Sequence, residues 1–203
     1  MNARPTSNPP ITEIEDGLYI GDIESSHRVE ILKAHNISAM VSVTAGGLAY
    51  WRRAKNRQIV SEDRHLYVPA QDSKTHDLLP DLARICDFID RNRSSSPEPG
   101  GGGVLIHCEM GVSRSATALI AYLMRTHQWS FDTALGFVKE KRKIRPNSNF
   151  KEQLVVWGEV GYEIWEDEEN KVPKAPYAAF LERRAERLKA LGLTGDEPVV
   201  PDL

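Results

Sequence analysis

Residues 104–124 read VLIHCEMGVSRSATALIAYLM and combine an apolar run, a short polar segment and a second, longer apolar run. The first run predicts a β-strand over 104–106, and the last predicts a helix over 115–127. A loop that enters a helix presents unpaired main-chain N–H groups and the positive end of the helix dipole. The stretch therefore predicts an anion-binding site at the N-terminus of a helix.

Two side chains of this loop have chemistry suited to a bound phosphate. Cys108 lies at the strand end, where the field that attracts an anion also stabilises a thiolate, the nucleophilic form of cysteine. Arg114 follows six residues later, and its planar guanidinium can bind two phosphate oxygens at once, unlike a lysine. Gly111 allows a tight turn, and Ser115 can hydrogen-bond the sulfur. We predict Cys108 as nucleophile and Arg114 as phosphate ligand.

The loop carries a recognisable signature. HCEMGVSRS (107–115) resembles the motif of the cysteine-based protein phosphatases, in which histidine and cysteine are followed by five residues, an arginine and a serine or threonine. EIEDGLYIG (13–21) looks like the first hairpin of the dual-specificity phosphatases, Ser42-Val43-Thr44 like their next strand end, and IRPNSNFKEQL (144–154) like their closing motif. The resemblance covers roughly 11–165. The lysine of a nucleotide-binding Walker loop is absent.

The resemblance implies a phosphotyrosine-phosphatase-like three-layer fold and hydrolysis of phosphotyrosine together with phosphoserine or phosphothreonine. It also implies a cysteinyl-phosphate intermediate. The phosphate would be held by the main-chain N–H groups of the loop, which belong to Glu109, Met110, Gly111, Val112, Ser113 and Arg114. Asn147 matches an asparagine that braces this loop in the family, although it could equally cap the following helix. His107 is expected to donate to the main chain rather than to act as acid or base.

Such a reaction needs a general acid, because an unprotonated alkoxide or phenoxide leaves poorly. The aspartates considered are Asp63, Asp72, Asp77, Asp81 and Asp87. Asp72 directly follows the apolar β-type run LYVPA, so its loop should leave the sheet at the same edge as the Cys108 loop. VPAQDS also resembles the acid loop of the family. Asp72 is therefore the predicted acid, and a simple turn residue is the alternative.

The remaining pattern indicates an α/β fold with a small, mostly parallel central sheet flanked by helices. Strands are expected at 18–20, 39–43, 66–68 and 104–106, and helices at 29–34, 79–89, 115–127, 130–143 and 148–165. Ser130 and Ser148 are the expected N-caps of the last two helices. Cys86 falls on the core-facing stripe of the helix at 79–89.

The ends of the chain differ in composition from the centre. Residues 1–10 predict a flexible tail, and residues 11–165 predict the catalytic domain. Residues 94–103 predict a surface connector rich in serine, proline and glycine. Residues 166–203 predict an acidic linker followed by an amphipathic helix at 177–191, bounded by Pro176 and Gly192. This helix is expected to pack on the domain, with docking of a partner as the alternative.

Composition limits the classes of partner. The 203 residues carry a formal net charge of −3, which provides no general attraction to nucleic acid or to an anionic membrane. No apolar run is long enough for membrane insertion, so we expect a cytoplasmic or nuclear protein. The two cysteines do not form a metal-binding spacing, and neither a metal nor another cofactor is expected. A redox bond between Cys86 and Cys108 is left open.

Phosphorylated proteins are the expected substrates. The variable loop residues Glu109, Met110, Val112 and Ser113 include an acid and no base, which disfavours highly charged inositol lipids. A lipid phosphatase and a catalytically weak phospho-binding scaffold remain alternatives. The basic run WRRAKNR (51–57) could rim the pocket or could form a solvated surface.

Overall fold

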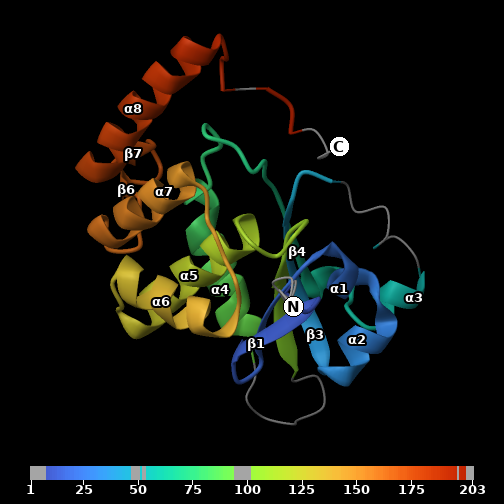
Figure 1. Ribbon diagram of the computed structural model, residues 1–203. Helices are drawn as coiled ribbons and strands as arrows, with labels where there is room; N and C mark the ends of the chain where they lie inside the picture. Colours follow the sequence, from blue (N-terminus) through green and yellow to red (C-terminus); the bar gives the residue numbers. More distant parts are fainter. Residues whose placement is uncertain (1–7, 47–50, 52–53, 94–101, 196, 200–203) are drawn as a thin grey trace, which may run out of the picture.

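A five-stranded sheet runs through the centre of the protein, with its strands in the order β1-β2-β5-β3-β4 (Figure 1). The computed structural model describes residues 8–46, 51, 54–93, 102–195 and 197–199. The strands are β1 (Ile11–Glu15), β2 (Leu18–Gly21), β3 (Ile37–Thr44), β4 (His65–Pro69) and β5 (Gly103–His107). β1 and β2 form an antiparallel hairpin, and all other neighbouring strands are parallel. The predicted small, mostly parallel sheet is confirmed.

Helices cover both faces of this sheet and give the predicted three layers (Figure 1). The larger layer contains α4 (Leu79–Asn92), α5 (Arg114–His127), α6 (Phe131–Lys141) and α7 (Ser148–Glu159). On the other side of the sheet lie α1 (Ile23–His27), α2 (Val29–Ala34), α3 (Ala54–Arg57) and the 3₁₀ turn η1 (Glu62–Arg64).

The central strand β5 is buried along its whole length, as expected for a parallel strand covered on both faces. Val104 and Ile106 belong to the larger core, beneath α4 and α5. Leu105 points to the opposite face and packs in the smaller core with Leu32 and Met40. Because successive side chains of a strand alternate between faces, one apolar run fills two cores.

Helix α5 is the centre of the larger layer. Every residue from Arg114 to Met124 is buried, which explains why this segment is apolar or small on all sides. α5 packs on the sheet and against α4, α6 and α7. The N-terminus of α5, where the predicted anion site lies, is therefore held by a fully packed helix.

Both ends of α7 differ from the predictions. Ser130 caps α6 as expected by accepting a hydrogen bond from the Thr133 N–H. The cap of α7 is Asn147, which accepts from the Phe150 N–H at 2.9 Å, so the prediction of Ser148 was wrong. α7 ends at Glu159, before the predicted limit of 165. Gly161 and Tyr162 both adopt φ of 65°, a left-handed conformation that terminates a helix.

The C-terminal segment contains more regular structure than its acidic composition indicated. A short antiparallel pair, β6 (Trp165–Asp167) and β7 (Val172–Pro173), lies within the predicted linker. α8 (Ala175–Leu191) follows. Because it begins at Ala175, Pro176 lies in its first turn and not before it, where the sequence analysis placed it. The helix ends at Gly192, where φ is 67°.

The predicted apolar stripe of α8 packs on the domain. Tyr177, Phe180 and Leu188 are buried, and Leu181 packs partly against the core. Leu191 belongs to the predicted stripe but is 59% exposed. Packing of α8 on the domain is therefore confirmed, and docking of a partner stays an untested alternative.

Residues 8–10, which the sequence assigned to the tail, are hydrogen-bonded to the domain. The Arg142 guanidinium donates to the carbonyl of Pro9, and the Asp22 N–H donates to the carbonyl of Pro10. Residues 1–7 of the predicted tail and 94–101 of the predicted connector lie outside the described residues. Among the helices that the structure describes, none combines the length and apolar character that crossing a membrane requires.

The docking of α8 can be tested by removing its most buried ring. Phe180 is fully buried, so Phe180→Ala should lower the free energy of unfolding by about 3–5 kcal/mol. Leu191→Ala on the same helix should change it by less than about 0.5 kcal/mol, because that side chain is exposed. Urea unfolding followed by tryptophan fluorescence measures both. Equal unfolding midpoints for the two variants would contradict the described packing.

Candidate active site

The loop between β5 and α5 makes a tight turn around Cys108. Gly111 adopts φ of 64°, and a Cβ atom at this position would lie 2.5 Å from Nη2 of Arg142 and 2.6 Å from the carbonyl oxygen of Gly21. Only glycine satisfies both constraints without displacement of its neighbours. The conformation predicted for Gly111 is therefore present, and it is imposed by packing from two other segments of the chain.

The carbonyl groups of this loop are bonded to residues outside it. The carbonyl of Glu109 accepts from the Ile23 N–H at 3.1 Å, and that of Val112 accepts from the Arg145 N–H at 2.9 Å. The carbonyl of Gly111 accepts from Nε of Arg142 at 2.9 Å. The carbonyl and N–H of one planar trans peptide point in opposite directions, so the N–H groups that follow these carbonyls point the other way.

Those N–H groups belong to Met110, Val112 and Ser113. None of the three donates a hydrogen bond to any other residue that the structure describes. Adjacent free N–H groups at a helix N-terminus form an anion-binding concavity. Three of the six N–H groups predicted to bind phosphate therefore point away from the bonded carbonyls and are available to an anion.

Cys108 and Arg114 lie at the two ends of this loop. Cys108 is 2% exposed, and its Sγ lies 3.1 Å from Oγ of Ser115. Arg114 is the first residue of α5 and is 3% exposed, and its Nη1 donates to the carbonyl of Ala70 at 3.1 Å. Ala70 follows β4, so Arg114 links the Cys108 loop to the segment that carries Asp72.

Asp72 lies beside the Cys108 loop, as its position after β4 predicted. Its Oδ1 accepts from the hydroxyl of Ser113 at 2.9 Å and from Nδ2 of Asn147 at 2.7 Å. Within the described residues no hydrogen bond reaches Oδ2, and the side chain is exposed. Asn147 caps α7, as one of its two predicted roles required, and its side chain holds Asp72. Its contact with the Cys108 loop is made by its main-chain N–H, which donates to the hydroxyl of Ser113 at 3.2 Å.

The loop and its neighbours line a pocket with a volume of about 650 Å³. Its lining residues are Asp72, Cys108, Glu109, Met110, Val112, Ser113, Arg114, Arg145, Pro146, Asn147, Ser148 and Lys151. Met110 is 72% exposed and also lines a second hollow on the other side of the loop. Arg145 and Lys151 place two positive charges at the pocket. The sequence analysis quoted both within 144–154 but gave them no role.

A family model described as the catalytic domain of dual specificity phosphatases matches residues 18–160. This range contains the loop, Asp72 and Asn147. The chain belongs to the dual-specificity phosphatase family.

Individual relatives agree with this membership. Human dual specificity protein phosphatase 16 is 35% identical over 152 residues, which cover 74% of this chain and 21% of the relative. The Yvh1 phosphatase domain from Chaetomium thermophilum has a TM-score of 0.65 and 30% identity, over 74% of this chain and 96% of that domain. A human tyrosine phosphatase-like serine/threonine/tyrosine-interacting protein has a TM-score of 0.64 and 27% identity, over 74% of this chain and 96% of that protein chain. The chain spans between 21% and 36% of the length of the curated relatives that it matches.

A chain of buried and partly buried side chains, joined by hydrogen bonds, ends at His107, next to Cys108. Arginine only donates hydrogen bonds, so Nδ1 of His65, 3.3 Å from Nη1 of Arg57, must be an acceptor. Nε2 of neutral His65 then donates to Oγ of Ser42 at 2.7 Å, and Ser42 donates to Nε2 of His107 at 2.6 Å. His107 therefore carries its proton on Nδ1.

Burial keeps both rings of this chain neutral. It lowers the pKa of His107 to about 3 and the pKa of His65 to about 4. The sequence analysis did not identify Ser42 or His65 as partners of His107. No local signal marked them, because the three residues come from three different strands.

Other predicted features lie away from the pocket. Among the described residues of 51–57, none lines it, and Trp51 is buried instead. Cys86 is buried on α4 as predicted, both cysteines are free thiols, and burial raises the pKa of Cys86 to about 12. The part of the chain that the structure describes contains no group of three His, Cys, Asp or Glu side chains suited to a metal.

The buried histidines should make stability depend on pH. An unfolded histidine binds a proton near pH 6.5, whereas folded His65 does so only near pH 4, so the unfolded state binds more protons between these values. Stability should therefore fall as pH drops from 6.5 to 4, by up to about 1.4 kcal/mol per pH unit for each such histidine. His65→Gln removes one of these groups and should make the measured decline less steep. The measurement is the free energy of unfolding by urea at several pH values between 4 and 6.5. If it changes equally with pH in the variant and in the unaltered protein, His65 is not held neutral in the folded state.

Proposed function

We propose that this protein is a phosphatase that hydrolyses phosphotyrosine and phosphoserine or phosphothreonine in proteins through a cysteinyl-phosphate. The observation that carries the proposal is that three carbonyls of the Cys108 loop accept hydrogen bonds from residues outside the loop. The N–H groups of Met110, Val112 and Ser113 therefore point toward one site. Family membership supports the same reaction class.

In the first step the thiolate of Cys108 attacks phosphorus in line with the leaving oxygen. The S–P bond forms, the P–O bond breaks, and a proton on Asp72 passes to the departing oxygen. The loop N–H groups and the Arg114 guanidinium bind the equatorial oxygens. Preorganised donors of this kind stabilise the charge of the transition state without reorganising.

In the second step water attacks phosphorus and the S–P bond breaks. Asp72, now a carboxylate, takes the proton of the attacking water, and phosphate is released. The Ser115 hydroxyl, 3.1 Å from Sγ, stabilises the departing thiolate. Oδ2 of Asp72 is the oxygen suited to carry the proton, because the two hydrogen bonds of the carboxylate both go to Oδ1.

The charges at the pocket support a phosphoprotein substrate. Arg145 and Lys151 can meet acidic side chains next to a phosphorylated residue, while Glu109 lies in the loop itself. A substrate with several clustered phosphates would have to bring them close to that carboxylate. A reduced Cys108 is essential to the mechanism, which favours the cytoplasm or nucleus as the place of action.

Replacing the nucleophile or the acid should have different effects. Cys108→Ser should reduce phosphate release from p-nitrophenyl phosphate to background, because the thiolate is lost. Asp72→Asn should lower kcat for phenyl phosphate by about 10²–10⁴, and less for p-nitrophenyl phosphate, which has a better leaving group. Asp63→Asn is the matched control, because Asp63 lies in η1 and does not line the pocket.

Steady-state kinetics of the purified full chain measures these effects. Equal phosphate release by the unaltered protein and Cys108→Ser would instead support a phospho-binding scaffold. Equal kcat values for Asp72→Asn and Asp63→Asn would contradict the acid role of Asp72.

The substrate class can be tested with two panels of equal phosphate concentration. Phosphotyrosine and phosphothreonine peptides with acidic flanking residues should give a kcat/KM at least about tenfold above that of soluble phosphoinositides. A preference for phosphoinositides in malachite-green assays would favour a lipid phosphatase and would contradict the proposal.

A further inference from the structure

We propose that the C-terminal helix α8 positions the general acid, with Arg184 and Tyr177 holding the segment 73–78 that follows Asp72. The proposal rests on the function proposed above. Residue 184 lies beyond the segment 18–160 that the family model matches, so this is a property of the additional C-terminal segment. Arg184 and Tyr177 are positioning residues, because they act on Asp72 through the main chain of its loop.

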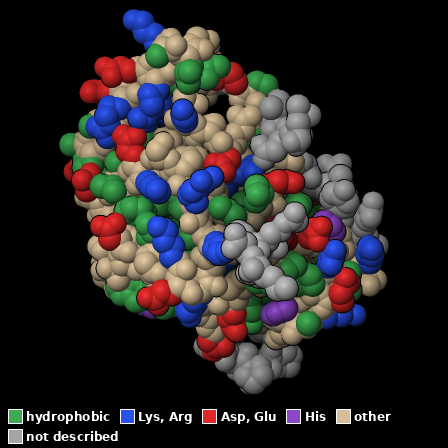
Figure 2. All heavy atoms as spheres, viewed as in Figure 1, with side chains coloured by type: hydrophobic (Ala, Val, Ile, Leu, Met, Phe, Trp, Pro, Cys, Tyr) green, Lys and Arg blue, Asp and Glu red, His purple; other side chains and the backbone are tan. Residues whose placement is uncertain are grey.

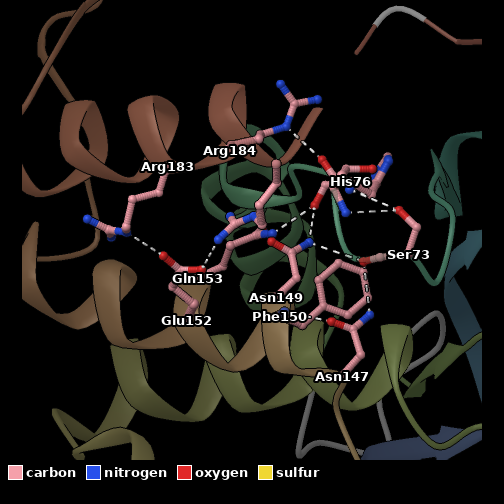
Figure 3. Close-up of polar contacts among 11 residues, drawn as sticks. Ser73, His76, Asn147, Asn149, Phe150, Glu152, Gln153, Arg183 and Arg184 are labelled. Atoms are coloured by element: carbon pink, nitrogen blue, oxygen red, sulfur yellow. Dashed lines mark hydrogen bonds and ion pairs between the residues drawn. The ribbon is translucent and has the colours of Figure 1, made fainter. Parts of the chain in front are cut away.

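One side of the segment 73–78 is held by α7 (Figure 3). Nδ2 of Asn149 donates to the carbonyls of Ser73 at 3.2 Å and of His76 at 2.7 Å. The side chain of Gln153 donates to the His76 carbonyl at 2.8 Å and accepts from the Leu78 N–H at 2.7 Å. These bonds come from within the family domain.

The other side of the segment is held by α8. Nε of Arg184 donates to the carbonyl of Thr75 at 2.6 Å, and the hydroxyl of Tyr177 donates to Oδ2 of Asp77 at 2.8 Å. Figure 3 shows Arg184 reaching from α8 toward this loop, while the neighbouring Arg183 points to Glu152 on α7. Thr75 and Asp77 lie between the residues that α7 binds, so the segment is gripped from both sides.

α8 is itself firmly attached, which a positioning element requires. Phe180 is fully buried, and Tyr177 is 3% exposed. Glu152 of α7 receives both Arg183 and Arg187, at 2.7 and 2.8 Å. Lysine and arginine side chains are visible over α7 and α8 on the face drawn in Figure 2. The two ion pairs of Glu152 join α7 to α8. Movement of α8 would therefore break a packed core as well as surface contacts.

His76 lies close enough to Arg184, and to Arg114 of the catalytic loop, for both charges to affect its pKa. Burial lowers the pKa of His76 to about 4, with smaller contributions from the positive charges of Arg184 and Arg114. His76 is therefore neutral at physiological pH and does not repel either arginine. The ring also packs edge-on against Phe150 of α7.

These contacts bear on catalysis because proton transfer is sensitive to position. Asp72 is only five residues from Asp77 and three from Thr75. A carboxylate that is displaced by about 1 Å can lose up to about 10² in rate. Loss of the α8 contacts would leave the segment held by α7 alone, and Asp72 would occupy the productive position for less of the time.

The experiment measures kcat of the full chain with aryl phosphates of increasing leaving-group basicity, because only poor leaving groups need the acid. Arg184→Met keeps an unbranched apolar stem of similar length up to Nε but removes the guanidinium and its hydrogen bond. It should lower kcat for phenyl phosphate about tenfold and kcat for 2,4-dinitrophenyl phosphate by less than about twofold. Tyr177→Phe, which removes one hydroxyl, should show the same trend with a smaller effect.

Arg183→Met is the matched control, since Arg183 lies next to Arg184 on the same helix but contacts Glu152 and not the loop. It should leave kcat unchanged for all substrates. In an Asp72→Asn background, Arg184→Met should have no further effect, because the group that it positions is already gone. Thermal unfolding of each variant identifies any loss of folded protein.

The outcomes separate this proposal from the proposed function. Three results would overturn the positioning role alone. Arg184→Met could leave kcat unchanged, or it could lower kcat equally for all leaving groups. It could also lower kcat in the Asp72→Asn background as much as in the unaltered protein. An unchanged kcat in Asp72→Asn would overturn the acid assignment and the positioning role with it.

Discussion

The orientation of the peptide groups between Cys108 and Arg114 is the constraint on which the rest of the site depends. These peptides could point their carbonyls inward, where they would repel an anion and destabilise a thiolate. Three contacts prevent this: the N–H groups of Ile23 and Arg145 and the side chain of Arg142 each bind a loop carbonyl. The orientation of the loop peptides is therefore set by residues outside the loop.

The same principle extends to Asp72, the proposed acid. Asp72 is held through one oxygen by Ser113 and Asn147, so the Cys108 loop and the N-cap of α7, within the closing motif, both contribute to its position. Ser113 serves two functions, because its main chain belongs to the phosphate loop and its hydroxyl meets the acid. This sharing couples the position of the acid to that of the phosphate loop. The hydrogen bonds from α7 and α8 to residues 73–78 hold the segment that follows Asp72 in the same way.

The buried framework explains why these loops can be held so closely. α5 is packed on all sides, and β5 carries side chains into both cores, so Cys108 lies between two rigid elements. Below it, His107 and His65 stay neutral and are joined through the hydroxyl of Ser42. A charged ring at either position would have to be desolvated, which makes the neutral chain the stable state at physiological pH.

The sequence by itself determined the features that depend on local pattern. It predicted β2, β3, β4 and β5 and the central helices from the pattern of apolar residues, and Cys108, Arg114 and the need for Gly111 from one contiguous motif. Asp72 could be chosen because the ends of parallel strands meet at one edge of the sheet. Only the tertiary structure decided which contacts hold these residues. They are the hydrogen bonds to the loop carbonyls, the bonds that join His65, Ser42 and His107, the Asn147 cap of α7, and the bonds from α8 to residues 73–78. Such contacts join residues as much as 109 positions apart, and no periodicity or short motif records which distant donor will meet a given carbonyl.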